Sequence, residues 1–442
     1  MISPRMTWIN QAGCRIDHAS VSIVFDPWID GTAFNDGWDL IVPSVMRASD
    51  LESATHIWFS HEHPDHFSPS VLKRISPAKR EFITILFRST RDRRISRFCY
   101  NLGFRVIELD ETTPLSLGPN FTVTCHPHGT LDSFIYCDID GLRILNINDC
   151  IFVTDTERVR ALSAYRNCHV LMCQFGFAEK VGNEADRPMR EKEGAYWISE
   201  LSKTVAIVQP EFTIPCANFK FFCREDNAYM NVGAATVNQA YSRLIQDGIT
   251  KPVVLAPGDI WNFSEWDSTR SLSIYGEAWT TKDRRIRSCP TVTVDIIVAL
   301  NGNFISQVRG DNSRFALILF SILPGRLPFS IARVTVWITD HGIGGQFDLR
   351  YGLRLDGSIQ REKAEVELNS DILAACLKDL YGLSALIISG CFQGTPYAHR
   401  RLFNMAHIRM MNSSKERFDF FYVVTNMLRA VKMVVSKIQR SA

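Results

Sequence analysis

The sequence predicts an α/β protein in two parts, a layered α/β domain over residues 1–285 and a smaller α+β domain over residues 286–442. In the first part, β-branched and aromatic runs alternate with amphipathic helical stretches, which is the pattern of a layered α/β fold. In the second part, apolar residues alternate at period two before helical segments follow. The length of 442 residues also fits about two domains better than one core.

Short apolar runs bounded by turn residues predict the strands of the first part. These runs are 21–28, 54–60, 81–87, 104–110, 120–128, 133–139, 142–149, 169–176 and 212–219. A tight Asp-Gly turn joins 133–139 to 142–149 as a hairpin. Helices are predicted at 68–75, which begins with Ser and Pro, at 91–104, which ends at Gly103, and at 190–210.

The second part is predicted to contain strands and two helices. The predicted strands are 291–302, 315–323, 332–340 and 345–357. An amphipathic helix is expected at 370–383, capped by Ser370 or Asp371, and a longer one at 416–440. Residues 366–394 resemble sterol-carrier-like lipid-binding domains in their order of polar strand, amphipathic helix, then strand and Gly. A dimerisation or lid domain is the alternative, so a homo-oligomer is one expectation.

Composition excludes several classes of protein. Hydrophobic residues make up 46% of the chain and charged residues 22%, as in ordinary globular proteins. A net charge of +2 gives no field that would attract nucleic acid. Twelve cysteines occur without a CxxC pair, which suggests reduced thiols in a cytoplasmic protein. No signal peptide is evident, and the longest apolar run is too short for a membrane span.

The stretch HEHPDH, residues 61–66, is the main chemical signal. It follows an apolar strand directly, so its loop is held rigidly at a strand end. Alternate side chains of a short segment share one side, so His61 and His63 can hold one ion while Asp65 and His66 face a second position. Imidazole and carboxylate ligands suit zinc, iron or manganese. The alternative interpretation is a surface histidine cluster or a set of helix caps.

Residues 8–225 resemble the metallo-β-lactamase superfamily, through VFDPW, the HxHxDH motif and two later segments. The resemblance implies an αββα sandwich and a binuclear metal site. It assigns His61 and His63 to the first metal and Asp65 and His66 to the second. The later segments would supply a third histidine and a bridging aspartate. These residues are His128, with His126 as the weaker candidate, and Asp149.

One departure from the superfamily concerns the last metal ligand. The family normally has a histidine near a strand that reads apolar-Pro-x-His, but here the strand reads TIPCANF and no histidine occurs between 170 and 340. Cys216, Asn218 or water would take this place. An open coordination position weakens a hydrolase interpretation and is what a metal needs in order to bind O2.

The segments DPWIDGTAFNDGWDL, PHGTLDS and CQFGFAEKVGNEAD resemble the lactamase-like domain of CMP-N-acetylneuraminate hydroxylase. That family also carries a Rieske module, whose paired Cys/His motifs are absent from this chain. Any oxygen chemistry would therefore occur at the lactamase-type metal pair. This arrangement resembles the lactamase-fold diiron monooxygenases, which hydroxylate bulky apolar or thioester-bound substrates.

Other residues have two interpretations each. Trp28, Phe34 and Trp38 lie in a loop expected to overhang the metals, either as a substrate wall or as plain loop packing. Asp132 either orients His128 or caps a turn. A basic run is either a solvated helix face or a holder of phosphates on a CoA or nucleotide carrier. The run contains Arg88, Arg91, Arg93, Arg94 and Arg97.

Three functions are consistent with these residues. The first is a binuclear nonheme iron monooxygenase that uses two iron ions, O2 and an external electron donor on a lipophilic or thioester-linked small molecule. The second is a zinc- or manganese-dependent hydrolase of the lactonase or phosphodiesterase type, with a hydroxide bridging the ions. The third is a binding or scaffold protein with a decayed site.

Overall fold

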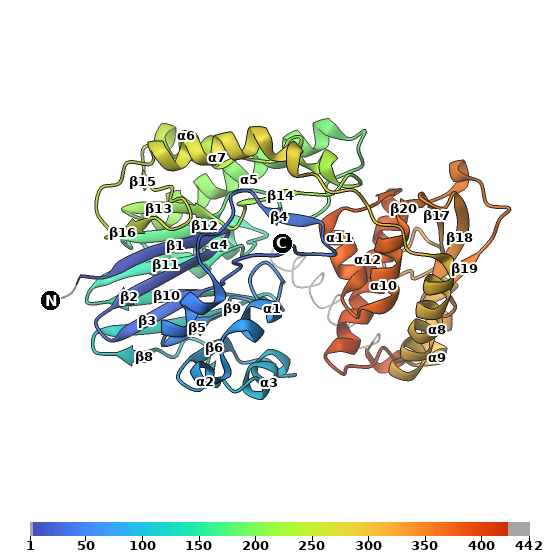
Figure 1. Cartoon of the computed structure of the whole chain (residues 1–442), viewed down its shortest axis with the longest axis horizontal. Coiled ribbons are helices and arrows are strands. Elements are labelled where there is room, and N and C mark those ends of the chain that lie inside the picture. The colour runs from blue at the N-terminus through green and yellow to red at the C-terminus, as the bar shows by residue number, and fades with distance from the viewer. Residues whose placement is uncertain (1–2, 423–442) are drawn as a thin grey trace, which may run out of the picture.

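The computed structural model describes residues 3–422 and has two seven-stranded sheets packed face to face (Figure 1). The first sheet has the order β16 (Ile260–Trp261), β1 (Arg5–Asn10), β2 (Gly13–His18), β3 (Val21–Phe25), β5 (His56–Trp58), β6 (Thr84–Arg88) and β7 (Arg105–Leu109). The second has the order β15 (Lys251–Pro252), β13 (Phe212–Cys216), β12 (Val170–Gln174), β11 (Leu142–Asn148), β10 (Asp132–Ile139), β9 (Phe121–His128) and β8 (Leu115–Gly118). Both sheets mix parallel and antiparallel pairs.

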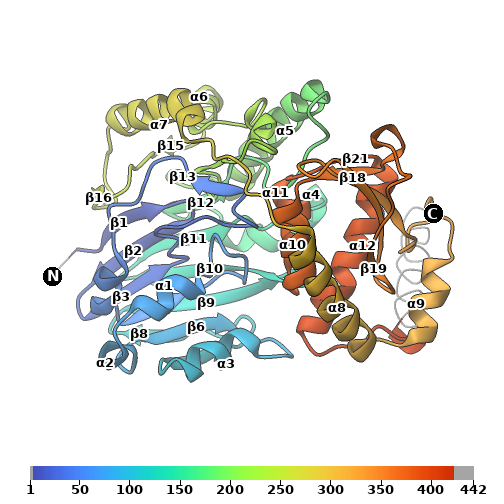
Figure 2. The ribbon, with the colours of Figure 1, turned by 45° about the vertical axis from the view of Figure 1, so that its right-hand side comes forward.

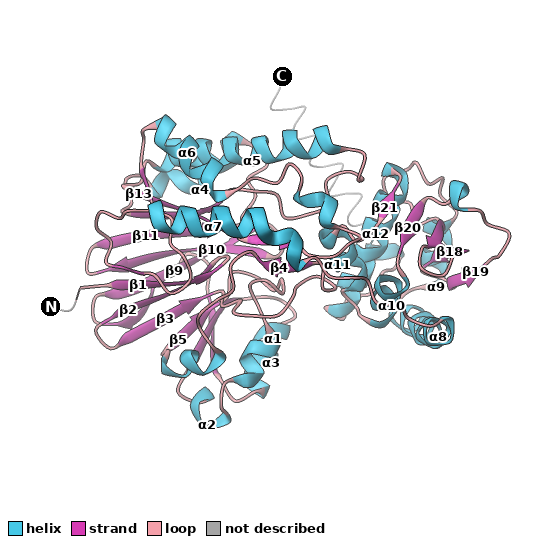
Figure 3. Cartoon of the chain, turned by 45° about the horizontal axis from the view of Figure 1, so that its top comes forward, coloured by secondary structure: helices cyan, strands magenta, loops and turns pink. Residues whose placement is uncertain are grey.

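Helices cover the outer faces of both sheets, so the predicted αββα sandwich is confirmed (Figure 3). On the first sheet lie α1 (Pro69–Arg74), α2 (Pro77–Arg80) and α3 (Arg94–Asn101). On the side of the second lie α4 (Asp155–Leu162), α5 (Arg187–Val208), α6 (Val237–Asp247) and α7 (Thr269–Thr281). Between the sheets, apolar side chains such as Phe25 and Trp58 meet Ile135 and Cys137 in the main core. Burial of these alternating faces stabilises the sandwich.

Local sequence explains where several helices begin and end. The hydroxyl of Ser68 accepts a hydrogen bond from the amide of Val71, and a proline opens the first turn of α1. Thr236 and Gln239 form a capping box at the start of α6. Gly103, at φ +96°, follows α3 in a conformation that glycine adopts without strain. The predicted helices at 68–75 and 91–104 are therefore confirmed.

The C-terminal α+β region forms a separate layer beside the sandwich (Figure 2). Its sheet has the order β19 (Gly352–Leu355), β18 (Ile343–Asp348), β17 (Val334–Ile338), β20 (Val366–Leu368) and β21 (Gln393–Gly394). Its helices are α8 (Val294–Asp311), α9 (Arg314–Ser321), α10 (Ser370–Lys378), α11 (Gly382–Ser389) and α12 (Pro396–Ser413). Its buried apolar cluster draws only on residues between Ile297 and Phe418.

Several predictions for this region were wrong. The segments 291–302 and 315–323 form α8 and α9 instead of strands. In α8 the buried residues Ile297, Phe304 and Val308 recur at helical spacing, and a short apolar run alone does not distinguish helix from strand. Within 366–394 a second helix, α11, follows α10, and the strand expected after the helix is only the two-residue β21.

Two further expectations concern helix ends. The N-cap of α10 is Asn369 instead of Ser370 or Asp371, because the Ser370 hydroxyl donates to the carboxylate of Asp340. The helix predicted at 416–440 lies mostly outside the described residues, which end at 422. Among the helices of residues 3–422, none combines the length and apolarity that crossing a bilayer requires.

Short elements complete the described chain. A two-stranded ribbon pairs β4 (Trp38–Leu40) with β14 (Lys220–Phe222). The 3-10 helices are η1 (Ala48–Ser53), η2 (Ser163–Tyr165), η3 (Ala228–Asn231), η4 (Lys282–Arg285) and η5 (Arg361–Lys363). The ribbon ties the loop after β3 to the segment after β13, which brings two remote parts of the chain to one edge of the sandwich.

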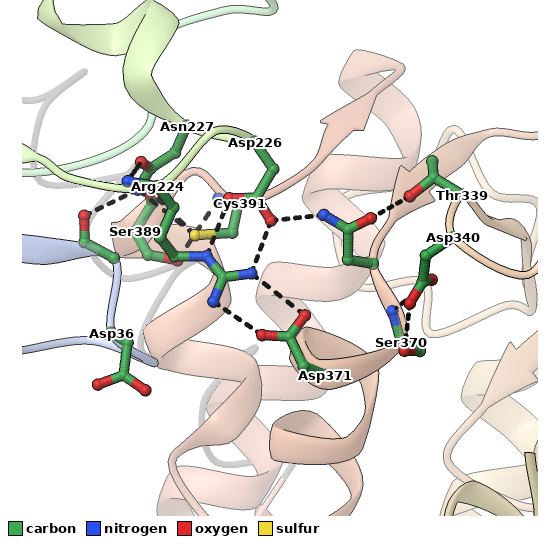
Figure 4. Close-up of polar contacts among 12 residues, drawn as sticks. Asp36, Arg224, Asp226, Asn227, Thr339, Asp340, Ser370, Asp371, Ser389 and Cys391 are labelled. Atoms are coloured by element: carbon green, nitrogen blue, oxygen red, sulfur yellow. Dashed lines mark hydrogen bonds and ion pairs between the residues drawn. The ribbon is translucent and has the colours of Figure 1, made fainter. Parts of the chain in front are cut away.

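A buried ion-pair network joins the sandwich to the C-terminal region (Figure 4). The guanidinium of Arg224, whose side chain is 3% exposed, donates to Asp226 at 2.9 Å and to Asp371 of α10 at 2.7 Å. Asn369 donates at 3.0 Å to Oδ2 of Asp226, the oxygen that also accepts from Arg224. Paired charges of this kind are costly to separate once buried.

Hydrogen bonds from the Asn227 side chain to backbone carbonyls hold the same junction together. The Asn227 amide donates to the carbonyl oxygens of Gly37 and Ser389, both at 2.9 Å. A Cβ atom at Gly37 would lie 2.5 Å from the Cβ of Ser389, so only glycine allows this approach. The contacts fix α11 and the neighbouring α12 over one edge of the sandwich.

Candidate metal centre

The candidate metal centre lies where the carboxyl ends of several strands meet. Asp26 follows β3, the loop 59–68 follows β5, and Asp149 follows β11. Parallel strands end at a common edge, so residues far apart in sequence converge there. The loop after β5 carries the HEHPDH motif.

The structure brings together His61, His63 and Asp149. One ligand atom from each lies within 4.8 Å of the other two. The Nε2 atom of His61 is 2.8 Å from Nδ1 of His63 and 3.6 Å from Oδ2 of Asp149. Two imidazoles and one carboxylate are a donor set for zinc, iron or manganese. These three residues therefore form a candidate metal site, while the predicted division of ligands between two metals stays a prediction.

Asp65 and His66 form a second group beside the first. The Nε2 atom of His66 lies 3.3 Å from Oδ2 of Asp65 and 3.4 Å from Oδ2 of Asp149. Asp149 thus stands between His61 and His66, where a bridging carboxylate would be needed. Among the described residues, the buried Nε2 of His66 and Oδ1 of Asp149 have no hydrogen-bond partner. Buried polar atoms are normally partnered, so these two atoms fit a cation.

Supporting residues that the motif does not contain orient the ligands. The buried carboxylate of Asp26 lies 3.1 Å from Nδ1 of His66 and accepts from the backbone amide of Ser60 at 2.8 Å. The Ser60 hydroxyl lies 2.9 Å from Nδ1 of His61, and Gln11 donates to Asp65 at 3.2 Å. Such partners fix the ring orientation of metal-binding histidines. The Asp-Pro step after a buried strand was the sequence signal for Asp26.

Burial and neighbouring charges shift the pKa values of the histidines and carboxylates in the site. Burial and the neighbouring His61 together lower the pKa of His63 to about 3. Burial opposes the ionised form of Asp149, yet His61 and His66 hold its pKa below the usual range. Burial also opposes the charged form of His66, but three carboxylates, Asp65, Asp149 and Asp26, raise its pKa. A neutral His63 beside ionised Asp149 is the state in which both can bind a metal.

His128 and His126 lie apart from this cluster. The Nε2 of His128 donates to the carbonyl oxygen of Ile151 at 2.6 Å, and its ring packs on Phe152. The Nε2 of His126 is 2.5 Å from the hydroxyl of Tyr165. The assignment of His128 as a ligand stays a prediction, which would require its ring to leave the carbonyl.

The edge of β13 offers no clear ligand among Cys216, Ala217 and Asn218. Cys216 is fully buried, and burial raises the pKa of its thiol well above the usual value. The Asn218 amide donates to the carbonyl of Ala235 at 3.2 Å. Of the three, Ala217 lines the cavity next to the metal ligands. The side chain that this edge presents to the cavity is therefore a methyl group, which cannot bind a metal.

A cavity of about 390 Å³ opens over His63, Asp65 and Asp149. Its walls combine residues of the sandwich with residues of α11 and α12. The C-terminal contributors are Ser384, Ile387, Ile388, Phe403, Ala406, His407 and Met410. The C-terminal region therefore roofs the candidate metal centre with mainly apolar side chains.

The residues predicted to form a substrate wall divide into two groups. Phe34 and Trp38 line the cavity, and their rings contact each other edge to face at 4.5 Å. Trp28 is buried, donates to the carbonyl of Gly31, and is not among the lining residues. Asp132 lines the cavity opposite His128 in the β9–β10 pairing. Burial raises the pKa of Asp132, and the neighbouring His61 opposes this rise.

Sequence reasoning missed Lys220, which is 3% exposed behind the cavity wall. Its Nζ atom donates to the carbonyl of Phe177 at 3.1 Å and lies 4.5 Å from the ring centre of Trp38 and 4.1 Å from that of Phe222. Burial lowers the pKa of Lys220 to about 7, although Asp65 opposes this shift. The ammonium and the rings together position Trp38.

The lowered pKa of Lys220 should make the free energy of unfolding depend on pH. Between about pH 7 and the ordinary lysine pKa of 10.5, the unfolded chain binds a proton that the folded chain has lost. The free energy of unfolding should therefore rise with pH across this window, by at most about 1.4 kcal/mol per pH unit. Denaturant unfolding at several pH values should show this slope in the wild type and not in Lys220→Met. The exposed Lys79→Met is the control; equal slopes in both variants would contradict the assignment.

The fold and the site define the class of protein: this chain has the metallo-β-lactamase fold and carries a candidate metal site at its strand ends. It is distantly homologous to CMP-N-acetylneuraminate hydroxylase. It is 28% identical to the cytidine monophosphate-N-acetylneuraminic acid hydroxylase of Xenopus laevis over 211 residues, 45% of this chain and 33% of that protein. The chain thus spans about a third of the length of that relative. The resemblance predicted from the sequence is confirmed.

No family model matches the chain. Solved structures with similar folds share little sequence with it. CmlA, a diiron β-hydroxylase from Streptomyces venezuelae, aligns with a TM-score of 0.41 and 15% identity, over 59% of this chain and 54% of that one. A possible metal-dependent hydrolase from Veillonella parvula aligns with a TM-score of 0.45 and 15% identity, over 59% of this chain and 100% of that one.

Proposed function

We propose that the protein is a binuclear nonheme iron monooxygenase that hydroxylates a bulky, largely apolar substrate, free or carried as a thioester. One observation carries the proposal. The cluster of His61, His63 and Asp149 contains two histidines and one carboxylate, and such a set leaves positions open on iron for O2 and substrate. Asp65 and His66 would hold the second iron, and Asp149 would bridge. Ala217 at the edge of β13 supports an open position.

The sequence relatives support the same choice. The curated proteins that match this chain include several named as hydroxylases of a cytidine monophosphate sugar acid. Hydroxylation inserts oxygen into a C–H bond, whatever the substrate. The similarity covers 45% of this chain at most in these matches, so it supports a reaction class and not a substrate.

The proposed reaction balances with an external electron donor. A substrate C–H group, O2, two electrons and two protons give a C–OH group and water. When bound, the two irons would supply the O2 and electron-transfer chemistry. The chain itself orients the substrate between Trp38 and Phe177, and Ile387, Ile388 and Phe403 of the roof exclude water. Exclusion of water protects oxidising sites from side reactions.

Metal analysis with an oxygen challenge tests the proposal. The protein would be produced in iron-supplemented, zinc-poor medium, and its metals counted by elemental analysis. We expect about two irons per chain and an absorption change in the visible range when O2 enters an anaerobic, reduced sample. Tightly bound zinc, with no spectral response to O2 after iron reconstitution, would overturn the monooxygenase.

A zinc- or manganese-dependent hydrolase is the second candidate. The observation that favours it is the place of Asp149 between His61 and His66, since a carboxylate shared by two ions also suits a bridging hydroxide. Hydrolysis of lactone or phosphodiester substrates by the zinc-loaded protein, without O2, would establish this function. Full metal loading without turnover on either substrate type would favour a scaffold protein.

A further inference from the structure

A second cavity, of about 720 Å³, adjoins the cavity over the metal ligands. It lies between the segment from β6 to α3 and the end of α12. The two cavities share four lining residues, which are Thr130, Leu131, His407 and Met410. A ligand bound in the second cavity can therefore extend past the β9–β10 turn toward the metal centre.

The second cavity carries an excess of positive charge. Its basic lining residues are Arg88, Arg91, Arg94, Arg97 and Lys415, and its acidic ones are Glu62, Asp92 and Glu416. Arg94 is neutralised by Glu62 and by Asp92, which lies 3.2 Å away. Two of the three acidic residues are therefore paired with Arg94. The other cations determine which ligand the cavity attracts.

Three of the cations have no carboxylate partner among residues 3–422. Arg88 donates to the backbone carbonyls of Thr130 and Asp132, at 3.1 and 2.6 Å, and its buried Nε–H has no acceptor among the described residues. Arg97 donates to the backbone carbonyl of Asp92. Lys415 is exposed, and its ammonium has no ion-pair partner within the described part of the chain. Carbonyl oxygens bind guanidinium groups without cancelling their charge, so these cations can still attract an anion.

We propose that the second cavity binds the phosphate group of a soluble, amphiphilic phosphomonoester whose apolar part enters the cavity over the metals. Planar guanidinium groups form paired hydrogen bonds with phosphate oxygens, and several cations together match its double charge. The apolar roof formed by α11 and α12 receives the rest of the molecule. The inference rests on the proposed function only in taking the ligand to be the substrate, because binding itself needs no turnover.

Arg88 also links the phosphate site to the metal site. Its two hydrogen bonds hold the turn at residues 130–132, and Thr130 and Leu131 line both cavities. The same side chain therefore contributes positive charge and positions the boundary that the ligand crosses. It is unsuitable for a charge-only test, because its loss would disturb the turn.

Titration calorimetry with octyl phosphate, inorganic phosphate and octanol tests the site. We expect octyl phosphate to bind most tightly, with an affinity that falls as salt is raised from about 50 to about 300 mM. The double variant Arg97→Gln/Lys415→Gln should weaken octyl phosphate binding at least about tenfold and leave octanol unchanged. The double variant Arg105→Gln/Lys79→Gln, at exposed residues outside the cavity lining, is the charge-matched control and should bind as the wild type does.

Asp149→Asn separates the phosphate site from the metals. Retained octyl phosphate binding in this variant is expected, whereas its loss would assign the phosphate to the metals and overturn the proposal. Unchanged affinity in the double variant would also overturn it. Sedimentation with phosphatidylglycerol vesicles that depends on Arg97 and Lys415 would assign the cations to a lipid headgroup, against the soluble ligand proposed. Failure of the site would leave iron content and the O2 response untouched, so the two proposals fail separately.

Discussion

Replacing Asp149 with asparagine should remove at least half of the bound metal and lower turnover by about 100-fold or more. The carboxylate lies between His61 and His66, so its loss removes the shared ligand of both groups. Asparagine has the same shape, and the neighbouring core around β11 should stay folded. The expected loss therefore comes from charge and coordination.

Elemental analysis and thermal unfolding of the same sample distinguish a loss of metal binding from a loss of the fold. Asp110→Asn, a change of the same kind at an exposed loop residue, should bind metal as the wild type does. The metal-loaded wild type should lose stability when a chelator is added, and Asp149→Asn should lose much less, because bound ligands stabilise the folded state. Full metal content in Asp149→Asn would show that Asp149 is not a ligand.

Replacing Arg224 with methionine should lower the free energy of unfolding by about 3–5 kcal/mol. The substitution leaves the carboxylates of Asp226 and Asp371 partly buried, with side chains 14% and 12% exposed and no cation between them. Because Asp371 lies in the first turn of α10, the loss also loosens the contact that places α11 over the cavity. We expect limited proteolysis to cut near residues 286–293 in this variant first.

Denaturant unfolding and proteolysis measure this effect. The added change Asp371→Asn should restore part of the stability, since it removes one of the stranded charges. Arg361→Gln is the control, because its ion pair with Glu367 is exposed and should contribute less than about 1 kcal/mol. A loss in Arg224→Met no larger than in the control would mean that the network does not hold the junction.

Much of the metal site followed from the sequence because its key residues lie in one short loop. His61 and His63 are two positions apart after a strand, and Asp149 ends another strand that must reach the same edge. Asp26 and Gln11 were not predicted, because their roles depend on how distant segments pack. A buried aspartate before proline has many structural uses, and only the fold selects one.

The fold was predictable where periodicity agreed with chain length and turn residues. The sandwich strands met this condition, whereas the apolar segments of α8 and α9 fit strand and helix alike. The roof of the cavity was beyond prediction for a different reason. Nothing local in residues 384–410 shows that they pack on a loop more than 300 positions earlier, near Phe34 and His63.

The pairing of β1 with β16 sets an order for folding during synthesis. Met6 lies opposite Trp261, so the edge of the first sheet closes only when a strand about 255 residues later has been made. At ribosomal rates of about 5–20 residues per second, β1 waits roughly 13 to 50 seconds for this neighbour. Its other partner, β2, is available at once, and the exposed edge of β1 must be kept from pairing with other chains meanwhile. Production together with chaperones, which cover such an edge during the wait, should therefore raise the yield of correctly folded protein.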